Sequence, residues 1–572
     1  MRFLMWTLWG LGLLGTVSLH AQTASERLQQ VMDSVQGYQA YDRSQFPLGR
    51  ASVAVAQKRA AFAQGQLQTL QAIPASELSV SDQISHRMLQ FVLQDRIDRF
   101  TYKMHLIPIQ ADQGFHLNLN YRIRPLLSYH DAKAYLRMLE AIPQFVTDHL
   151  ALMRQGIQEG YVQPAIIFKG YDTTYDRHIV SNYAESDFYE PFKTLPSQLD
   201  ARQRDSILGV AERVITTVVV PSFQKIKTFF EEEYYPRARP SLGASELPNG
   251  KAFYQNRINY YTTTNQYTAQ DIHEIGMAEV DRIKAEMRAI IQEVGFQGDF
   301  LEFLTFLRTD PQFYAATGEA LLKEARDIAK RIDGELPKFF SLLPRTPYGV
   351  VKVPDALAPK YTGGRYAPPG SDTQPGRYLV NTYDLKSRPL YVLPALTAHE
   401  AVPGHHLQGS LNRELGDSIP QFRKNLYLSA YGEGWALYTE YLADEMGIYT
   451  TPYERFGKLT YEMWRACRLV GDTGLHAFGW SRDQAVNYLM DNTALSQHEC
   501  NTETDRYIAW PGQALSYKMG ELKIRELRNK AEEALGERFD IRAFHQVILG
   551  QGTVTLPILE EQVMAYIEQS RK

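Results

Sequence analysis

A helical spacing of apolar residues, which continues from about residue 24 to residue 335, constrains the fold more than any other feature of this sequence. Within it, Asp131–Ala141 and Ala269–Val280 place apolar side chains three or four positions apart, which is the period of an amphipathic helix. No unit of about 20 to 50 residues repeats along the chain, so a solenoid is not expected. The spacing predicts a mainly α-helical protein.

Capping residues and chain breakers divide this stretch into separate helices. Ser79 or Ser81, and Thr268, stand where helices are expected to start, because Ser and Thr side chains accept hydrogen bonds from the free N–H groups of a first turn. Breaks are expected at Gly160, Pro164, Pro236–Pro240 and Pro248–Gly250.

The sequence changes character between Leu343 and Pro394, where Pro and Gly accumulate. Two short runs there, Arg377–Tyr383 and Leu390–Leu393, are rich in β-branched and aromatic residues and predict strands. Helical spacing then returns in Leu396–Arg413, Tyr431–Met446 and Pro452–Leu469. We therefore expect an N-terminal helical region (22–342) and a C-terminal region (343–572) with a small β-sheet, joined in one integrated body.

Charge and composition exclude several classes of protein. The 572 residues are 44% apolar and carry 61 basic and 65 acidic side chains, for a net charge of −4. This balance provides material for a large core, but neither a basic track for nucleic acid nor a polybasic patch for membranes. The chain has no G-x-S-x-G elbow and no phosphate-binding P-loop, so serine and P-loop chemistry are not supported.

The first 21 residues have the pattern of an export signal. Arg2 precedes an apolar run from Phe3 to Val17, and small and polar residues follow up to Ala21. The run is shorter than the roughly 20 residues of a membrane-spanning helix, and no later segment is expected to be long enough. Residues 1–21 are therefore predicted to be a signal peptide of a periplasmic or secreted protein without stable membrane insertion. Since no Cys directly follows Ala21, a lipid anchor is not expected.

Cys467 and Cys500 are the only cysteines. An oxidising compartment would permit one bridge between them, but a large core does not need it, so two buried thiols are expected. A zinc site built mainly from thiolates is excluded.

Three histidines and a glutamate lie within eight positions, at His399, Glu400, His405 and His406, in a chain with 14 His. The first two begin like the H-E-x-x-H motif, in which one helical turn brings two imidazoles to zinc and the Glu acts as a base. Position i+4, however, is Pro403. On a regular helix neither later histidine could share an ion with His399, so either the helix is distorted or these are ordinary polar residues.

The dipeptide Pro403-Gly404 supplies a reason for a distortion, because Pro removes a helical hydrogen bond and Gly tolerates a strained backbone. If two residues loop out of the helix, His405 takes the position four residues after His399. For His406 to take that position, three residues would have to loop out. His405 is therefore the preferred second ligand.

Zinc in a catalytic site requires a third protein ligand and one open position for water. Glu433, among small residues at the start of a predicted helix, is the first candidate. Glu440 lies seven residues later on the same helix face, and we expect it to support a ligand or to form an ion pair.

These motifs together resemble a bacterial family long labelled a domain of unknown function, whose members are regarded as secreted metallopeptidases. The resemblance covers nearly all of the chain after residue 21 and rests on four segments, which are His399–His406, Glu433–Tyr438, Asp472–His476 and Arg506–Gly520. That family is similar to the helical gluzincin peptidases, such as neurolysin-like oligopeptidases, Taq-type carboxypeptidases and angiotensin-converting enzyme. Compared with the zinc-binding motif of these peptidases, this chain has two extra residues between His399 and His405.

The resemblance implies a zinc-dependent metallopeptidase that hydrolyses short peptides. His399, His405 and Glu433 would bind Zn²⁺, and Glu400 would take a proton from the attacking water and return it to the leaving amine.

In the similar peptidases a Tyr or His from a late segment stabilises the developing oxyanion. This points first to Tyr517 and then to His476 as a second donor, while Arg506 would clamp a peptide carboxylate. The alternative for each is a structural role, since the chain has 35 Tyr. The edge of the predicted strand Arg377–Tyr383 could bind extended substrate, or the strand could only support the sheet.

Two other functions remain open. The chain could be a zinc amide hydrolase that acts on a cell-wall peptide or an acylated small molecule. It could also be a catalytically inactive helical binding protein that keeps the site as a metal or ligand pocket.

Overall fold

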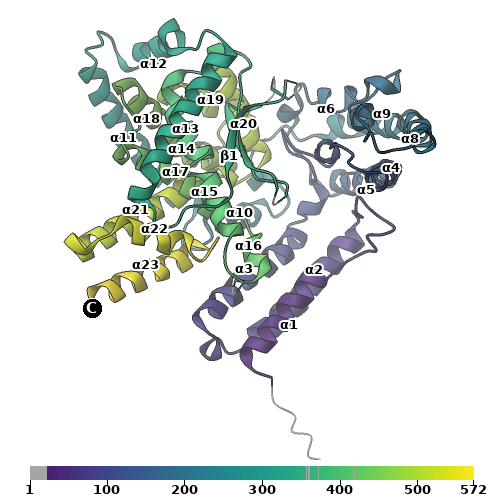
Figure 1. Ribbon diagram of the computed structural model, residues 1–572, viewed down its shortest axis with the longest axis horizontal. Helices are drawn as coiled ribbons and strands as arrows, with labels where there is room; N and C mark the ends of the chain where they lie inside the picture. The colour runs from purple at the N-terminus through teal and green to yellow at the C-terminus, as the bar shows by residue number, and fades with distance from the viewer. Residues whose placement is uncertain (1–21, 356, 359–360, 372, 418) are drawn as a thin grey trace, which may run out of the picture.

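Helices form most of the part of the chain that the structure describes, and one small sheet lies among them there (Figure 1). The computed structural model describes residues 22–572 except 356, 359, 360, 372 and 418. The predicted signal peptide lies outside the described residues. The mainly α-helical class with a small sheet is confirmed.

The α-helices follow one another as α1 (Ala24–Gly37), α2 (Val53–Gln71), α3 (Val80–Thr101), α4 (Tyr129–Glu140), α5 (Ile142–Glu159), α6 (Thr173–Asp176), α7 (Glu190–Lys193), α8 (Ala201–Val214), α9 (Val220–Thr228), α10 (Gly250–Thr262), α11 (Ala269–Glu293), α12 (Phe300–Thr309), α13 (Gly318–Phe339), α14 (Leu393–Glu400), α15 (His405–Arg413), α16 (Gln421–Lys424), α17 (Ser429–Glu445), α18 (Pro452–Ala477), α19 (Arg482–Asn492), α20 (Gln497–Ala509), α21 (Ser516–Leu535), α22 (Ile541–Leu549) and α23 (Leu556–Arg571).

Several helix ends are set by the capping residues noted in the sequence. Ser79, and not Ser81, caps α3 by accepting a first-turn N–H. Thr268 caps α11, where Asp271 returns the hydrogen bond in a capping box. Helix α5 is capped at its end by Gly160, whose φ of 80° lies in the left-handed region that favours glycine. These local signals therefore predict helix boundaries well.

The main core draws on both regions of the chain, on either side of residue 342. Helix α11 packs against α18, and α17 packs against α21. Helices α1, α2 and α3 enclose a second, smaller core, shown in purple and dark blue in Figure 1. Cys467 and Cys500 are free and buried, as expected.

One helical segment, Ala201–Arg237, is long and apolar enough to cross a membrane by length and composition. The expectation that no segment after residue 21 is long enough is therefore wrong. Phe223 and Phe230 of this segment are fully buried in the main core. A helix that packs inside a folded domain is apolar for this reason.

Short π-helical stretches precede Pro221 and Pro236 in this segment. Proline has no N–H group, so it cannot continue the hydrogen-bond pattern of an α-helix.

The sheet has the strand order β1-β3-β2, with β1 (Tyr348–Lys352), β2 (Gly364–Ala367) and β3 (Gly376–Val380). Strand β3 runs parallel to β1 and antiparallel to β2. It is a shorter form of the predicted strand Arg377–Tyr383, but the idea that this strand offers a free edge is wrong, because it is the middle strand. The two edge strands are β1 and β2.

The predicted strand Leu390–Leu393 is also wrong. The segment forms a 3₁₀ turn, Leu390–Val392, that leads into α14. Pro394 occupies the first turn of α14, where a missing N–H is tolerated. All eight residues of α14 are buried. Its first four residues, Leu393–Leu396, are all apolar, so they show no helical period.

Candidate metal centre

The predicted helix Leu396–Arg413 is two helices. Helix α14 ends at Glu400, and α15 begins at His405. The distortion expected at Pro403-Gly404 is therefore a complete interruption of the helix.

The turn between the two helices is held by close backbone contacts. The Gly404 N–H bonds to the Ala398 carbonyl at 2.9 Å, and the indole N–H of Trp435 on α17 donates to the Pro403 carbonyl at 2.9 Å. A Cβ atom at position 404 would lie 1.9 Å from the carbonyl oxygen of His399. Only glycine fits at this point of the turn.

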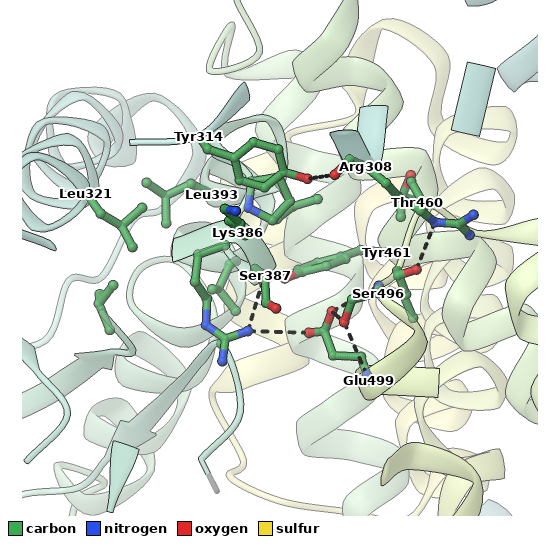
Figure 2. A pocket seen from close by; sticks show the side chains of 18 of the residues that line it. Arg308, Tyr314, Leu321, Lys386, Ser387, Leu393, Thr460, Tyr461, Ser496 and Glu499 are labelled. Atoms are coloured by element: carbon green, nitrogen blue, oxygen red, sulfur yellow. Dashed lines mark hydrogen bonds and ion pairs between the residues drawn. The ribbon is translucent and has the colours of Figure 1, made fainter. Parts of the chain in front are cut away.

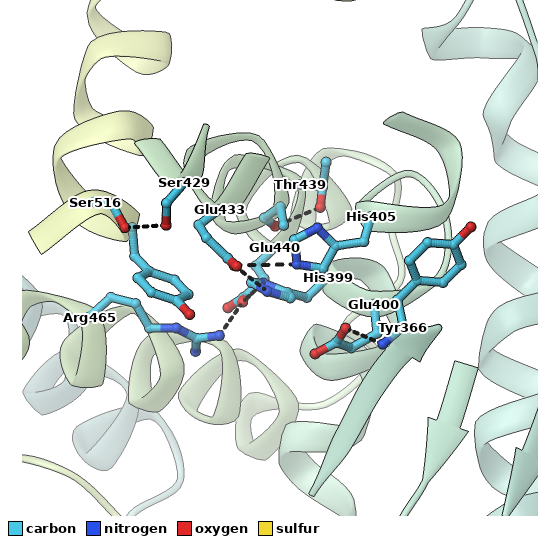
Figure 3. Close-up of polar contacts among 12 residues, drawn as sticks. Tyr366, His399, Glu400, His405, Ser429, Glu433, Thr439, Glu440, Arg465 and Ser516 are labelled. Atoms are coloured by element: carbon cyan, nitrogen blue, oxygen red, sulfur yellow. Dashed lines mark hydrogen bonds and ion pairs between the residues drawn. The ribbon is translucent and has the colours of Figure 1, made fainter. Parts of the chain in front are cut away.

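The turn places His399 and His405 side by side, and Glu433 of α17 completes the cluster (Figure 3). The imidazole rings are 4.8 Å apart and nearly perpendicular. The Glu433 Oε2 atom lies 3.5 Å from His399 Nε2 and 3.3 Å from His405 Nε2. One potential ligand atom from each residue lies within 4.8 Å of the others. Two imidazoles and one carboxylate form a donor set that suits zinc with an open position.

Electrostatics couple these side chains. Burial alone would lower the pKa of His399, but hydrogen bonds to Glu433 and Glu440 outweigh it and raise the pKa to about 10. Burial would raise the pKa of Glu433, but the two histidines hold it well below its usual range. Since a metal ligand must be deprotonated, a cation that binds here has to displace a proton from His399.

Glu440 holds the other nitrogen of the His399 ring. Its Oε1 atom lies 2.7 Å from His399 Nδ1, and Arg465 lies 3.1 Å from the same oxygen. A carboxylate in this position fixes the tautomer and the orientation of a metal-binding imidazole. The position of Glu440 agrees with the supporting role expected for it.

Glu400 is anchored by β2, an edge strand of the sheet. Its Oε2 atom accepts a hydrogen bond from the backbone N–H of Tyr366 in β2 at 2.7 Å. No hydrogen bond to Oε1 occurs among the described residues. In Figure 3 the carboxylate lies between the histidine pair and the sheet. One oxygen is held and the other is free, as a proton-transferring carboxylate requires.

His406 points away from the cluster. Its Nε2 atom lies 3.0 Å from the Thr346 carbonyl, and its Nδ1 atom lies 3.2 Å from the Tyr366 hydroxyl. Burial lowers the pKa of His406 to about 4. The geometry therefore agrees with the preference for His405 over His406.

Tyr517 of α21 lies between two guanidinium groups. Arg506 donates to its hydroxyl at 3.2 Å, and the Arg468 guanidinium carbon lies 4.1 Å from the centre of its ring. Burial and the charge of Glu433 would raise the pKa of Tyr517, but the two arginines outweigh them and lower it. A tyrosine whose proton is loosened in this way is a better donor to a developing oxyanion.

The prediction that His476 is an oxyanion donor is corrected by the structure. Its Nδ1 atom accepts from the Ala244 N–H at 3.0 Å, and its Nε2 atom lies 2.9 Å from the Tyr507 carbonyl. Burial lowers the pKa of His476 to about 3, so the ring is neutral and has a single N–H. Since that N–H is already bound, His476 joins α18 to the segments that carry Ala244 and Tyr507.

Asp472, one turn before His476, positions the loop that leads to the helix of Tyr517. Its carboxylate accepts from the Tyr254 hydroxyl at 2.6 Å and from the Gly512 N–H at 3.1 Å. It forms no ion pair among the described residues, and burial raises its pKa to about 7.

We expect Asp472 to make the folded protein less stable as the pH rises from about 4 to about 7. Over this range the folded protein keeps a proton that the unfolded chain has lost, so the free energy of unfolding falls, by roughly 4 kcal/mol in total. Asp472→Asn removes this titration and keeps an acceptor for Tyr254. In urea unfolding, the stability of wild type relative to the variant should be lower at pH 8 than at pH 5. The same difference at both pH values would contradict the argument.

Two contacts of the cluster were not anticipated from the sequence. Tyr427 donates to Glu433 Oε1 at 2.7 Å, and Arg465 pairs with Glu440. Tyr427 lies only six residues before Glu433, but one Tyr among 35 carries no signal of its own. Arg465 comes from a separate helix, and its partner could not be assigned without the fold.

The fold and the site define a mainly helical protein with a His/His/Glu cluster beside the edge of a small sheet. The chain belongs to the family described as "Bacterial protein of unknown function (DUF885)", whose model matches residues 32–563. No curated protein matches it.

Two solved structures are similar over nearly the whole chain. One is described as "the putative lipoprotein from Colwellia psychrerythraea" and has 25% identity and a TM-score of 0.86, covering 96% of this chain and 97% of that one. The other, "a putative lipoprotein of unknown function from Shewanella oneidensis", has 18% identity and a TM-score of 0.66, covering 95% of this chain and 100% of that one. The second likeness concerns the fold alone.

Proposed function

We propose that this protein is an exported, gluzincin-like zinc metallopeptidase that hydrolyses short peptides. The observation that carries the proposal is the convergence of His399, His405 and Glu433 next to a further carboxylate, Glu400, that is held by other contacts. Nitrogen and oxygen donors of this kind suit zinc, with a place left for water. The bound cation would polarise the substrate carbonyl and make water a better nucleophile.

Glu400 performs the proton transfers in this proposal. Its free Oε1 atom accepts a proton from the attacking water as the C–O bond forms, and it delivers a proton to the amide nitrogen as the C–N bond breaks. The Tyr366 N–H keeps the carboxylate in place. The Tyr517 hydroxyl, flanked by Arg506 and Arg468, donates to the carbonyl oxygen as negative charge develops there.

Strand β2 offers a place for the substrate backbone. It is one of the two edge strands, and it pairs on one side with β3. An extended peptide that adds to this edge would pass the carboxylate of Glu400, because the Tyr366 N–H faces it.

Export is part of the proposal. Residues 1–21 have the pattern of a signal peptide, and both similar structures are described with the words "putative lipoprotein".

Metal removal tests the proposed function. Zinc-loaded protein is incubated with a mixture of short peptides, and the new termini are mapped by mass spectrometry. We expect about one zinc per chain, cleavage that stops when 1,10-phenanthroline strips the metal, and recovery when Zn²⁺ is added back. Cleavage that continues in the stripped protein, or failure to bind zinc, would overturn the proposal.

A further inference from the structure

A cavity of about 220 Å³ lies beside α14, the helix that carries His399 and Glu400 (Figure 2). A benzene ring fits in a cavity of roughly 150 Å³, so there is room for a phenyl ring or a branched alkyl group. Its lining includes the apolar side chains of Leu321, Val380, Val392, Leu393, Leu396 and Leu495.

Two parts of the cavity wall belong to the elements that position Glu400. Leu396 lies one helical turn before Glu400 and therefore on the same face of α14. Gly363 directly precedes β2, the strand whose Tyr366 N–H binds Glu400. A peptide paired with the edge of β2 would pass Gly363 about three residues, or ~10 Å, from the point opposite Tyr366. A side chain near the scissile bond can therefore reach this cavity.

A third part of the cavity wall is connected to the proposed metal ligands by a series of side-chain contacts. Tyr461 lines the cavity, and the Arg465 guanidinium carbon lies 4.8 Å from the centre of its ring. Arg465 in turn pairs with Glu440, which holds His399. A chain of contacts through Tyr461, Arg465 and Glu440 thus connects the cavity wall to His399.

Polar atoms in the lining determine which groups it would accept. Thr460 is 1% exposed, and its Oγ1 atom has no hydrogen-bond partner among the described residues, so a ligand hydroxyl that meets it would be stabilised. Arg308, Lys386 and Arg388 also line the cavity. The acidic residue in the lining, Glu499, lies 4.0 Å from Arg388. Ligand cations are therefore disfavoured.

We propose that this cavity binds an apolar side chain of the substrate and thereby sets the cleavage specificity. Phe, Tyr and Leu have suitable size, and the Tyr hydroxyl can bond to Thr460. Lys and Arg are rejected by charge, and Ala leaves the cavity unfilled. The inference rests on the proposed peptidase function.

Gly363 offers a way to fill the cavity with little change to the backbone. A Cβ atom there meets only Leu396 Cδ2, at 3.9 Å, so Gly363→Leu should place its side chain in the cavity. Gly349 of β1 is a matched control, because a Cβ atom there meets nothing within 4 Å and Gly349 is not part of the lining.

The test compares wild type, Gly363→Leu and Gly349→Leu on peptides that carry Phe or Ala at each position near the mapped cleavage site. For wild type and Gly349→Leu we expect kcat/KM to favour Phe at one position by about tenfold or more. Gly363→Leu should lose this preference and still cleave the Ala peptide. An equal loss on both peptides, or an unchanged preference in Gly363→Leu, would overturn the assignment.

Binding of an aromatic amide supplies a readout that does not depend on hydrolysis. N-acetyl-4-fluorophenylalanine amide, observed by ¹⁹F NMR, is expected to bind wild type and Gly349→Leu but not Gly363→Leu. If peptides are cleaved and the probe binds all three proteins equally, the cavity assignment is wrong, but the proposed peptidase function still holds. If no peptide is cleaved, the proposed function fails, and the substrate assignment fails with it.

Discussion

Glu400→Gln is expected to lower kcat for peptide hydrolysis by roughly 10²–10⁴-fold, while zinc binding is retained. An amide has nearly the same shape as the carboxylate and can still accept the Tyr366 N–H, but it cannot take a proton from water. Glu400 is not among the three clustered ligand candidates, so its replacement should leave the metal in place. Single-turnover cleavage and metal analysis of the same preparation measure the two properties.

Glu537→Gln is a suitable control, because Glu537 is exposed and lies outside the site. This variant should match wild type in both measurements. Unchanged hydrolysis in Glu400→Gln would remove Glu400 from the role of base. Joint loss of hydrolysis and zinc would assign it to metal binding instead. A wild-type protein that binds zinc but cleaves nothing would favour the inactive binding protein.

His405→Ala is expected to weaken zinc binding by more than the roughly 10–100-fold that is typical when an outer partner of a ligand is lost. Hydrolysis should be lost with the metal. His406→Ala should keep zinc, because the His406 ring is bound to Thr346 and Tyr366. Competition with a chromophoric chelator measures both affinities.

The His406 variant loses buried hydrogen bonds, which should cost about 1–3 kcal/mol of stability. Circular dichroism and urea unfolding therefore accompany the metal titration. If the folded His406→Ala protein loses zinc and His405→Ala keeps it, the ligand assignment is reversed.

Features that depend on neighbours in the sequence could be predicted, and features that depend on distant segments could not. Thr268 and Gly160 mark helix ends because their effect on the backbone is local. The start of the buried helix α14, Leu393–Leu396, is entirely apolar and has no helical period, so the sequence there predicts a strand that the structure does not form. The middle position of β3 depends on pairing with both β1 and β2, which no single segment reveals.

The site shows the same division. His399 and His405 lie close together in the sequence, and the insertion between them suggested how they could meet. The environment of His476 depends on Ala244, which is 232 positions away, and on the Tyr507 carbonyl, which binds its N–H and so removes the ring from the oxyanion role. The binding of Glu400 to the Tyr366 N–H likewise requires the sheet to be in place.

The turn at Pro403-Gly404 also explains how the histidine spacing of this chain differs from that of the regular H-E-x-x-H motif. Without those two residues the sequence would read His399-Glu400-Ala401-Val402-His405, which is H-E-x-x-H. In a continuous helix, two extra residues would rotate the second histidine by about 200° relative to the first. Because α14 ends before α15 begins, that rotation does not occur. Each histidine then lies near the end of its own helix. A two-residue insertion and a local helix break can therefore preserve one ligand triangle in chains whose histidine spacings differ.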